Sequence, residues 1–311
     1  MNPPLPNSNN NGHLMNNLFT PATRLAVACA IALPMLLSTA HAAQPVQQSY
    51  ASAEQATEAL AAAWHEGQRT ALLKVFGPVG WKLVSSNDPV AEQEARERLA
   101  AEYDSAHRLE TVGPHTARLI VGTDEFPYPV PILEHNGRWR FDTAAGIDEI
   151  LDRRVGRNEL DAIAVCRAYV EAQREYAAAD HVGHRYASKL VSADGSHDGL
   201  YWPVTDGEVA SPIGPLMARA AAEGYGRASG KTLTPYHGYY YRMLSHPAGG
   251  RPAGAPGFAL IAFPARYGNS GVLSYIVSED GVVYAKNLGP GTDRVARQMT
   301  LYQPDPSWSL P

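Results

Sequence analysis

The sequence predicts a two-domain α+β protein, in which helices precede a curled antiparallel sheet and a long helix then packs on an antiparallel meander. Three observations lead to this fold class. Apolar residues recur at helical spacing through residues 52–106, alternating segments follow up to residue 142, and a second helix-then-strands series starts at Asn158. The 311 residues also exceed the usual length of one domain.

The first half carries clear helix and turn signals. Ser52 is placed as the N-cap of an amphipathic helix that Gly67 ends, and Asp88-Pro89 opens another helix that runs to about Ala106. A shorter helix is expected between them, at residues 70–76. Asn136-Gly137 is a strong hairpin signal. The segments expected to be strands are 117–122, 128–134 and 138–142, with the proline-rich start of the second at a sheet edge or in a connector.

This order of elements resembles the cone-shaped NTF2/cystatin-like fold, and the stretch from Ala61 to Leu73 (AAAWHEGQRTALL) is typical of its opening. We therefore expect residues 43–150 to form such a domain. The resemblance implies a sheet whose mouth can hold a ligand. A small-molecule carrier of this kind needs a roomy apolar cavity, which we expect to be lined from Trp64, Trp81 and Trp139.

The second predicted domain covers residues 151–311. Residues 146–157 read as the connection, with Asp152-Arg153-Arg154 exposed, and Asn158 as the N-cap of a long helix that reaches about Ala179. A short helix is expected at residues 216–223. The expected strands of the meander are 236–244, 257–264, 271–278 and 282–287.

Several stretches of this chain resemble DUF2950, a bacterial family of unknown function. They include CRAYVEAQREYA from Cys166, PYHGYYYR from Pro235, FALIAFPARYGNSG from Phe258 and DGVVY from Asp280. The resemblance runs from about Tyr50 to Trp308 and implies a secreted, periplasmic protein without an assigned activity. The second half also resembles the globular head of type IV pilins. It departs from a true pilin because no prepilin site precedes a long apolar helix, so assembly into a pilus is not expected.

Residues 22–42 have the pattern of a secretory signal peptide. Arg24 precedes the apolar run Leu25–Leu37, and Ala40-His41-Ala42 places small residues at −3 and −1 of a cleavage site. The run is too short to serve as a permanent membrane span. We expect the mature chain to begin at Ala43 and to work in the periplasm or outside the cell, with no membrane span after signal removal.

Two features near the start leave alternatives open. Met1 and Met15 both fit as the first residue, the second giving a more ordinary signal peptide. Cys29 lies too early in the apolar run for a lipid-attachment site, which favours a soluble form over a lipoprotein. Cys166 is then the remaining cysteine, so no disulfide within the mature chain is expected, and a buried helical position is its simplest interpretation.

Composition and motifs point away from several functions. The net charge of −5 argues against nucleic acid and anionic membrane surfaces as partners. The loop Asp194–Gly199 partly matches a calcium loop but lacks the closing carboxylate, and His181 and His184 lack ligand spacing. Ser270 lies in a turn between strands, without the helix that a nucleophile elbow needs. We therefore predict no catalytic residue, no metal site and no cofactor.

Aromatic residues supply the one suggestive surface. Thirteen of the sixteen tyrosines follow residue 150, and Tyr239 and Tyr241 share one face of a strand. If this face is exposed, it suits a peptide or a sugar. The five residues that we predict to bind such a partner are Tyr239, Tyr241, Arg242, Arg266 and Tyr267. The alternative is a tyrosine face packed on the helix from Asn158 or on the first domain. The sequence thus predicts a non-catalytic binding protein whose partner is an envelope protein or polymer, with an envelope hydrolase or a small-molecule carrier as alternatives.

Overall fold

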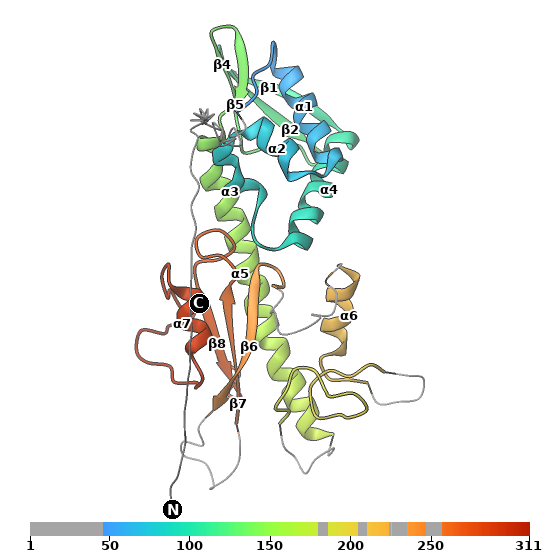
Figure 1. Cartoon of the computed structure of the whole chain (residues 1–311), viewed down its shortest axis with the longest axis vertical. Helices are drawn as coiled ribbons and strands as arrows, with labels where there is room; N and C mark the ends of the chain where they lie inside the picture. The colour runs from blue at the N-terminus through green and yellow to red at the C-terminus, as the bar shows by residue number, and fades with distance from the viewer. Residues whose placement is uncertain (1–45, 180–185, 205–209, 224, 226–234, 247–256) are drawn as a thin grey trace, which may run out of the picture. The chain divides into compact units, whose positions relative to one another are not determined.

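The computed structural model describes residues 46–179, 186–204, 210–223, 225, 235–246 and 257–311 (Figure 1). The predicted signal peptide and the histidines at 181 and 184 lie outside these residues. Residues 43–311 form one compact unit. The described part contains α-helices and two antiparallel sheets, of five and four strands, which confirms the α+β class. Within it, no helix combines the length and the apolar character that a membrane span requires.

Helix caps fix the elements of the first half. Ser52 accepts a hydrogen bond from the Gln55 amide (3.2 Å), and Gly67 ends the helix with φ 70°, a left-handed conformation that glycine adopts at low cost. Asp88 caps the next long helix as predicted. The helices are α1 (Ala53–Glu66), α2 (Arg69–Phe76), the 3-10 turn η1 (Pro78–Gly80), α3 (Trp81–Val84) and α4 (Pro89–Ser105).

The first sheet has the order β1-β2-β4-β5, and the two-residue strand β3 pairs with β2. Asn136 and Gly137, both with positive φ, form the predicted hairpin turn between β4 and β5. The expected strand 128–134 begins only at Ile132, because prolines precede it. The strand 107–113 was not predicted. The strands are β1 (His107–Gly113), β2 (Thr116–Val121), β3 (Phe126–Pro127), β4 (Ile132–His135) and β5 (Arg138–Phe141).

Helix α5 (Thr143–Ala178) corrects the prediction of a connection at residues 146–157 followed by a separate helix. It is continuous, and its N-cap is Asp142, which accepts a hydrogen bond from the Ala145 amide (3.2 Å). Asn158 is therefore not a cap. Its buried side chain instead donates a hydrogen bond to the Ser270 carbonyl (2.9 Å). The division of the chain at residue 150 into two separately folding domains stays a prediction.

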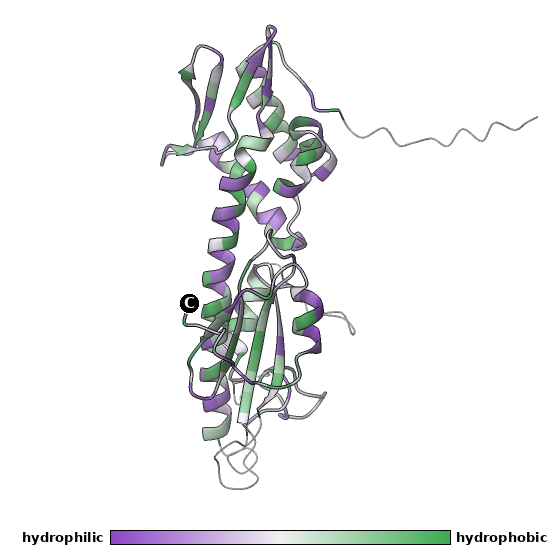
Figure 2. Cartoon of the chain, turned by 90° about the vertical axis from the view of Figure 1, so that its left-hand side faces the viewer, coloured by the Kyte–Doolittle hydropathy of each residue, from purple (hydrophilic) through white to green (hydrophobic). Residues whose placement is uncertain are grey.

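The second sheet is the predicted meander, with neighbours in chain order. Its two inner strands, β7 and β8, are almost wholly buried, and the strands of this sheet are largely in hydrophobic colours in Figure 2. The remaining elements are α6 (Gly214–Ala222), β6 (Tyr239–His246), β7 (Gly257–Pro264), β8 (Ser274–Ser278), β9 (Tyr284–Lys286) and α7 (Thr292–Gln298). The short helix α7 was not predicted.

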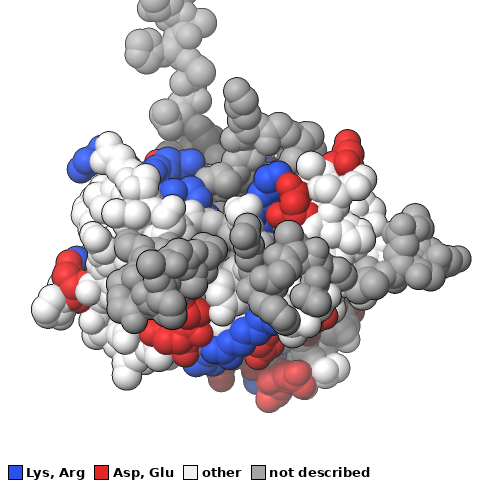
Figure 3. All heavy atoms as spheres, turned by 90° about the horizontal axis from the view of Figure 1, so that it is seen from below, with Lys and Arg blue, Asp and Glu red and all other residues white. Residues whose placement is uncertain are grey.

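Three hydrophobic cores result from this arrangement. The first lies among α1, α2, α4 and the first sheet, and includes Trp64, Phe76 and Phe141. The second lies between α5 and one face of the second sheet, and the third packs α7 and the C-terminal segment on the other face. Cys166 is fully buried in the second core, as expected. On the coloured surface of Figure 3, acidic and basic side chains lie next to each other in small groups.

Candidate functional site

The structure places the two predicted binding tyrosines of β6 in the interior. Tyr239 is 0% exposed and donates a hydrogen bond to the Leu273 carbonyl (2.8 Å). Tyr241 is half-buried, and its hydroxyl is buried without a hydrogen-bond partner in the described chain. Both pack in the core between α5 and the second sheet. Of the two interpretations of this strand, the structure favours the one in which the tyrosine face packs on the helix.

The other three predicted residues do not gather into one surface. The Arg242 guanidinium donates hydrogen bonds to the carbonyls of Ala296 (2.6 Å) and Met299 at the end of α7, so it holds that helix against β6. Arg266 lies over the Trp81 ring at 4.0 Å from its centroid. Tyr267 is half-buried in the turn before β8. A binding role for Arg266 and Tyr267 stays a prediction.

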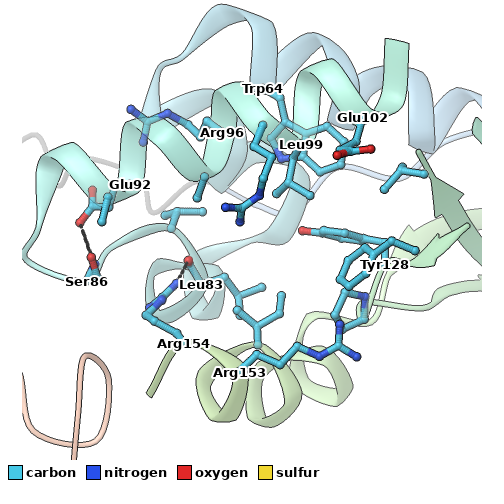
Figure 4. Close-up of a pocket in the computed structure, with 18 of the residues that line it drawn as sticks. Trp64, Leu83, Ser86, Glu92, Arg96, Leu99, Glu102, Tyr128, Arg153 and Arg154 are labelled. Carbon is cyan, nitrogen blue, oxygen red and sulfur yellow. Dashed lines mark hydrogen bonds between the residues drawn. The ribbon is translucent and has the colours of Figure 1, made fainter. Parts of the chain in front are cut away.

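A cavity of about 550 Å³ lies between α4 and α5 and is closed on one side by α1 and the β2–β3 segment (Figure 4). We call it the α4–α5 cavity. Its apolar lining includes Trp64, Leu72, Phe76, Leu83, Val121 and Ile150. Most of these side chains also belong to the first core, so the cavity is a gap in that core that opens to the surface. Of the three tryptophans expected in a carrier cavity, Trp64 lines it in the described structure.

Tyr128 is a polar residue of the α4–α5 cavity lining whose side chain is buried. Its side chain is 5% exposed, and its ring packs edge-on against Trp64 with centroids 5.4 Å apart. Figure 4 shows the hydroxyl directed into the cavity, and it makes no hydrogen bond with a described residue. Burial raises the pKa of this phenol, so the hydroxyl stays protonated near neutral pH and can donate a hydrogen bond.

Five arginines line the cavity, against three acidic residues. Two of the five are occupied by the protein itself. Arg154 donates hydrogen bonds to the carbonyls of Lys82 (3.1 Å) and Leu83 and to the Asn269 side chain (2.9 Å). Arg153 pairs with Glu149 (2.5 Å) and lies 5.0 Å from the centroid of the Phe126 ring. Both therefore stabilise the walls of the cavity.

The other three arginines are Arg96 and Arg98 on α4 and Arg157 on α5. None makes a hydrogen bond or ion pair with a described side chain. Burial, and then the nearby charge of Arg98, lowers the pKa of Arg157, while the Asp161 carboxylate raises it, so the two helices bring Arg98 and Arg157 near each other at this end of the cavity. Glu92 does not neutralise them, since its carboxylate is paired with Arg69 (2.6 Å) and accepts a hydrogen bond from the Ser86 amide (2.7 Å).

Glu102 and Asp124 supply the remaining negative charge. In Figure 4, Glu102 and Arg154 lie at opposite ends of the cavity. The Glu102 carboxylate packs against Gly122, where an added Cβ would lie 2.1 Å from Oε2. We call the end at Arg154, where Glu92 also lies, the arginine end; apolar side chains lie between it and Glu102.

Groups that could react are sparse around the cavity. Among the described residues, neither histidine nor cysteine lines it. The Ser86 hydroxyl donates towards Glu92 (3.4 Å) and accepts a hydrogen bond from the Asp88 amide (3.3 Å), with no histidine beside it. These contacts position the start of α4 and do not form a nucleophile–base pair.

His237 lies outside the cavity lining and is held between two carboxylates. Its Nδ1 lies 3.3 Å from Asp161 Oδ2 and its Nε2 lies 3.0 Å from Glu223 Oε2. Because the two ring nitrogens point apart, the carboxylates cannot share one ion with the ring. In the described chain, no group of three or more His, Cys, Asp or Glu residues is placed to hold a metal. The loop from Asp194 is held by Asp198, which pairs with Lys189 and accepts hydrogen bonds from Ala193 and Ser196.

Sequence reasoning did not assign the arginine end of the cavity or Tyr128. Arg154 was expected to be exposed in a connection, whereas it is half-buried on a continuous helix. The available signal was the spacing of Arg153, Arg154 and Arg157, which places the last two on one helical face. This spacing has a meaning only if the helix continues through residues 146–157, which the sequence predicts to be a connection.

The chain belongs to the family of proteins of unknown function DUF2950, whose family model matches residues 47–310. This membership confirms the family resemblance seen in the sequence. No curated protein and no solved structure matches the chain. The resemblances of the first half to an NTF2/cystatin-like cone and of the second half to a pilin head therefore stay predictions.

Proposed function

We propose that this member of the DUF2950 family is an exported, periplasmic protein that binds an apolar small molecule in the α4–α5 cavity and does not convert it. The observation that carries the proposal is the cavity itself. Its volume of about 550 Å³ lies in the range of small-molecule sites, and its floor consists of buried apolar side chains. Export rests on the signal-peptide pattern at residues 22–42.

Two observations favour this function over the other candidates. A hydrolase needs an activated nucleophile, and the one described serine at the cavity, Ser86, is engaged by Glu92 and Asp88. A surface for an envelope protein or polymer was expected at Tyr239 and Tyr241, but these side chains lie largely in the core. The small-molecule carrier, an alternative at the level of sequence, is therefore the function that the site supports best.

The binding test uses the chain from Ala43 to Pro311 and N-phenyl-1-naphthylamine, a neutral apolar probe whose emission rises in apolar surroundings. We expect saturable binding with one probe per chain. Ala95→Phe adds a ring to the cavity lining and should abolish the emission. The matched control is Ala101→Phe, on an exposed position of the same helix outside the lining, which should bind as the parent does. Absence of saturable binding, or equal binding by both variants, would contradict the proposal.

Export has its own test. N-terminal sequencing of the protein from a periplasmic fraction should give Ala43 as the first residue. A chain retained in the cytoplasm with residues 22–42 attached would remove the envelope from the proposal and leave the cavity unaffected.

A further inference from the structure

We infer that the ligand of the α4–α5 cavity is an amphipathic acid, an apolar chain that carries one oxyanionic head group, and that Arg98 and Arg157 bind this head group. The inference rests on the proposed function and adds the chemical class of the ligand. It follows from three features of the described cavity: two exposed arginines at one end that form no ion pair with a described side chain, a tyrosine hydroxyl that faces the cavity, and an apolar floor.

Two arginines at one end of the cavity, Arg98 and Arg157, are exposed and form no ion pair with a described side chain. Burial and then the charge of Arg98 on α4 lower the pKa of Arg157 on α5, while the Asp161 carboxylate one turn along raises it, so the two arginines lie near each other. Burial lowers the pKa of Arg154, the Glu92 carboxylate raises it, and the charge of Arg157 lowers it. Because both side chains are exposed, their N–H donors are available to an oxyanion at this end of the cavity. Carboxylates and phosphates match their planar donor groups.

Tyr128 adds a hydrogen-bond donor to the cavity. Its hydroxyl is directed into the cavity from a side chain that is 5% exposed, and no described residue accepts or donates to it (Figure 4). The hydroxyl is accessible from the cavity and can donate a hydrogen bond to a polar atom of a ligand bound there. The hydroxyl lies near enough to Arg154 for that charge to act on its pKa, which places it towards the arginine end.

The apolar floor of the cavity favours an amphipathic anion over a small inorganic one. Leu72, Phe76 and Val121 line the same cavity and are nearly inaccessible to solvent. Inorganic phosphate would leave these apolar surfaces unfilled, whereas an alkyl chain would cover them and gain the free energy of apolar burial. Glu102 at the far end of the cavity disfavours a second negative group there. The ligand is therefore an acid with one charged end.

The experiment measures displacement of N-phenyl-1-naphthylamine by ligands that share a chain and differ in head group. The competitors are dodecanoic acid, dodecyl phosphate, dodecanol and inorganic phosphate, near neutral pH. We expect the two acids to displace the probe at concentrations about tenfold or more below dodecanol, the effect of a charge-assisted contact. Inorganic phosphate should not displace it. The tighter of the two acids identifies the head group as carboxylate or phosphate.

Arginine variants locate the head group. Arg98→Gln and Arg157→Gln should each weaken dodecanoic acid or dodecyl phosphate about tenfold and leave dodecanol unchanged. Arg118→Gln is the control, since Arg118 lies on β2 outside the lining and pairs with Glu110 (3.6 Å). It should leave all four competitors unchanged.

The outcomes separate the two levels of the proposal. Equal displacement by dodecanol and the acids, or acid binding unaffected by Arg98→Gln and Arg157→Gln, would overturn the head-group inference while the probe still binds. Binding of inorganic phosphate as tight as that of dodecyl phosphate would also overturn it, because the apolar chain would then add nothing. If the neutral probe itself does not bind, the proposed function fails first.

Discussion

Replacing Asp88 should destabilise the protein more than the loss of an ordinary helix cap does. Asp88 is 1% exposed and caps α4 through a hydrogen bond from the Ala91 amide (3.2 Å). Its other oxygen accepts hydrogen bonds from the Tyr225 hydroxyl (2.9 Å) and the Gly238 amide (2.8 Å). One carboxylate thus joins the start of α4 to two segments more than a hundred residues later in the chain.

The expected magnitude follows from these three contacts. Loss of the cap costs about 1 kcal/mol. Each hydrogen bond to a buried carboxylate contributes about 1.5 kcal/mol, and its removal leaves Tyr225 or Gly238 unsatisfied. Asp88→Ala should therefore lower the free energy of unfolding by about 4 kcal/mol. Asp88→Asn keeps the cap but turns an amide nitrogen towards a donor, so a loss of about 2 kcal/mol is expected.

The assay is urea unfolding of the chain from Ala43, followed by far-ultraviolet circular dichroism and tryptophan fluorescence. The matched control is Asp142→Ala, because Asp142 caps α5 through one hydrogen bond, from the Ala145 amide (3.2 Å). The control should lose about 1 kcal/mol. If Asp88→Ala loses no more than Asp142→Ala, the contacts to Tyr225 and Gly238 do not stabilise the fold and the reasoning is refuted.

Three further predictions concern paired positions. Gly156→Ala should stabilise the protein by about 0.5–1 kcal/mol, because the new Cβ on this helix meets nothing within 4 Å. Gly146→Ala on the same helix should destabilise it, because its Cβ would lie 2.5 Å from Val130 Cγ2. Thermal unfolding must show changes in midpoint temperature of opposite sign for the two variants. Tyr239→Phe removes the hydrogen bond to Leu273 and should lower the free energy of unfolding by about 1 kcal/mol. Tyr241→Phe removes a buried hydroxyl that has no partner among the described residues, so it should leave the stability unchanged or raise it. Equal losses of stability in urea unfolding would contradict this prediction. The ion pair with Lys189 holds the pKa of Asp198 well below its usual range. The stability that Asp198 contributes is therefore present above its unfolded-state pKa and is lost as the pH falls through its folded-state pKa. Lys189→Met should raise the pKa of Asp198 in a carboxylate NMR titration, and an unchanged titration would show that the pair is not formed.

Local signals account for most of the elements that the sequence predicted. Ser52, Gly67 and Asp88 act at the helix ends where they were placed, and Asn136-Gly137 forms its turn. In each case the residue stabilises the structure through its own backbone or through an amide three residues away. Such contacts depend on neighbouring sequence alone, so they can be read without the tertiary structure.

Helix α5 shows where local signals mislead. Gly146, Gly156 and the run Asp152-Arg153-Arg154 read as a connection, and Asn158 reads as a cap. The helix continues because its first turns pack Ile147 and Ile150 on the first core, while its later turns enter the second core. Tertiary packing outweighs the cost of two glycines, about 1 kcal/mol each. The side chain of Asn158, freed from capping, bonds instead to Ser270.

The same continuity explains why the candidate site was out of reach of the sequence. Helical spacing places Arg154 and Arg157 on one face of α5, but it cannot say that α4 brings Arg98 towards that face. Helical spacing also cannot distinguish an arginine that forms hydrogen bonds within the protein from one that forms none. Arg154 satisfies carbonyls of Lys82 and Leu83 and so belongs to the structure. Arg98 and Arg157 hold no such carbonyls in the described chain and are exposed, so their donors are available to an anion at the cavity. Function is therefore to be sought at these two residues first.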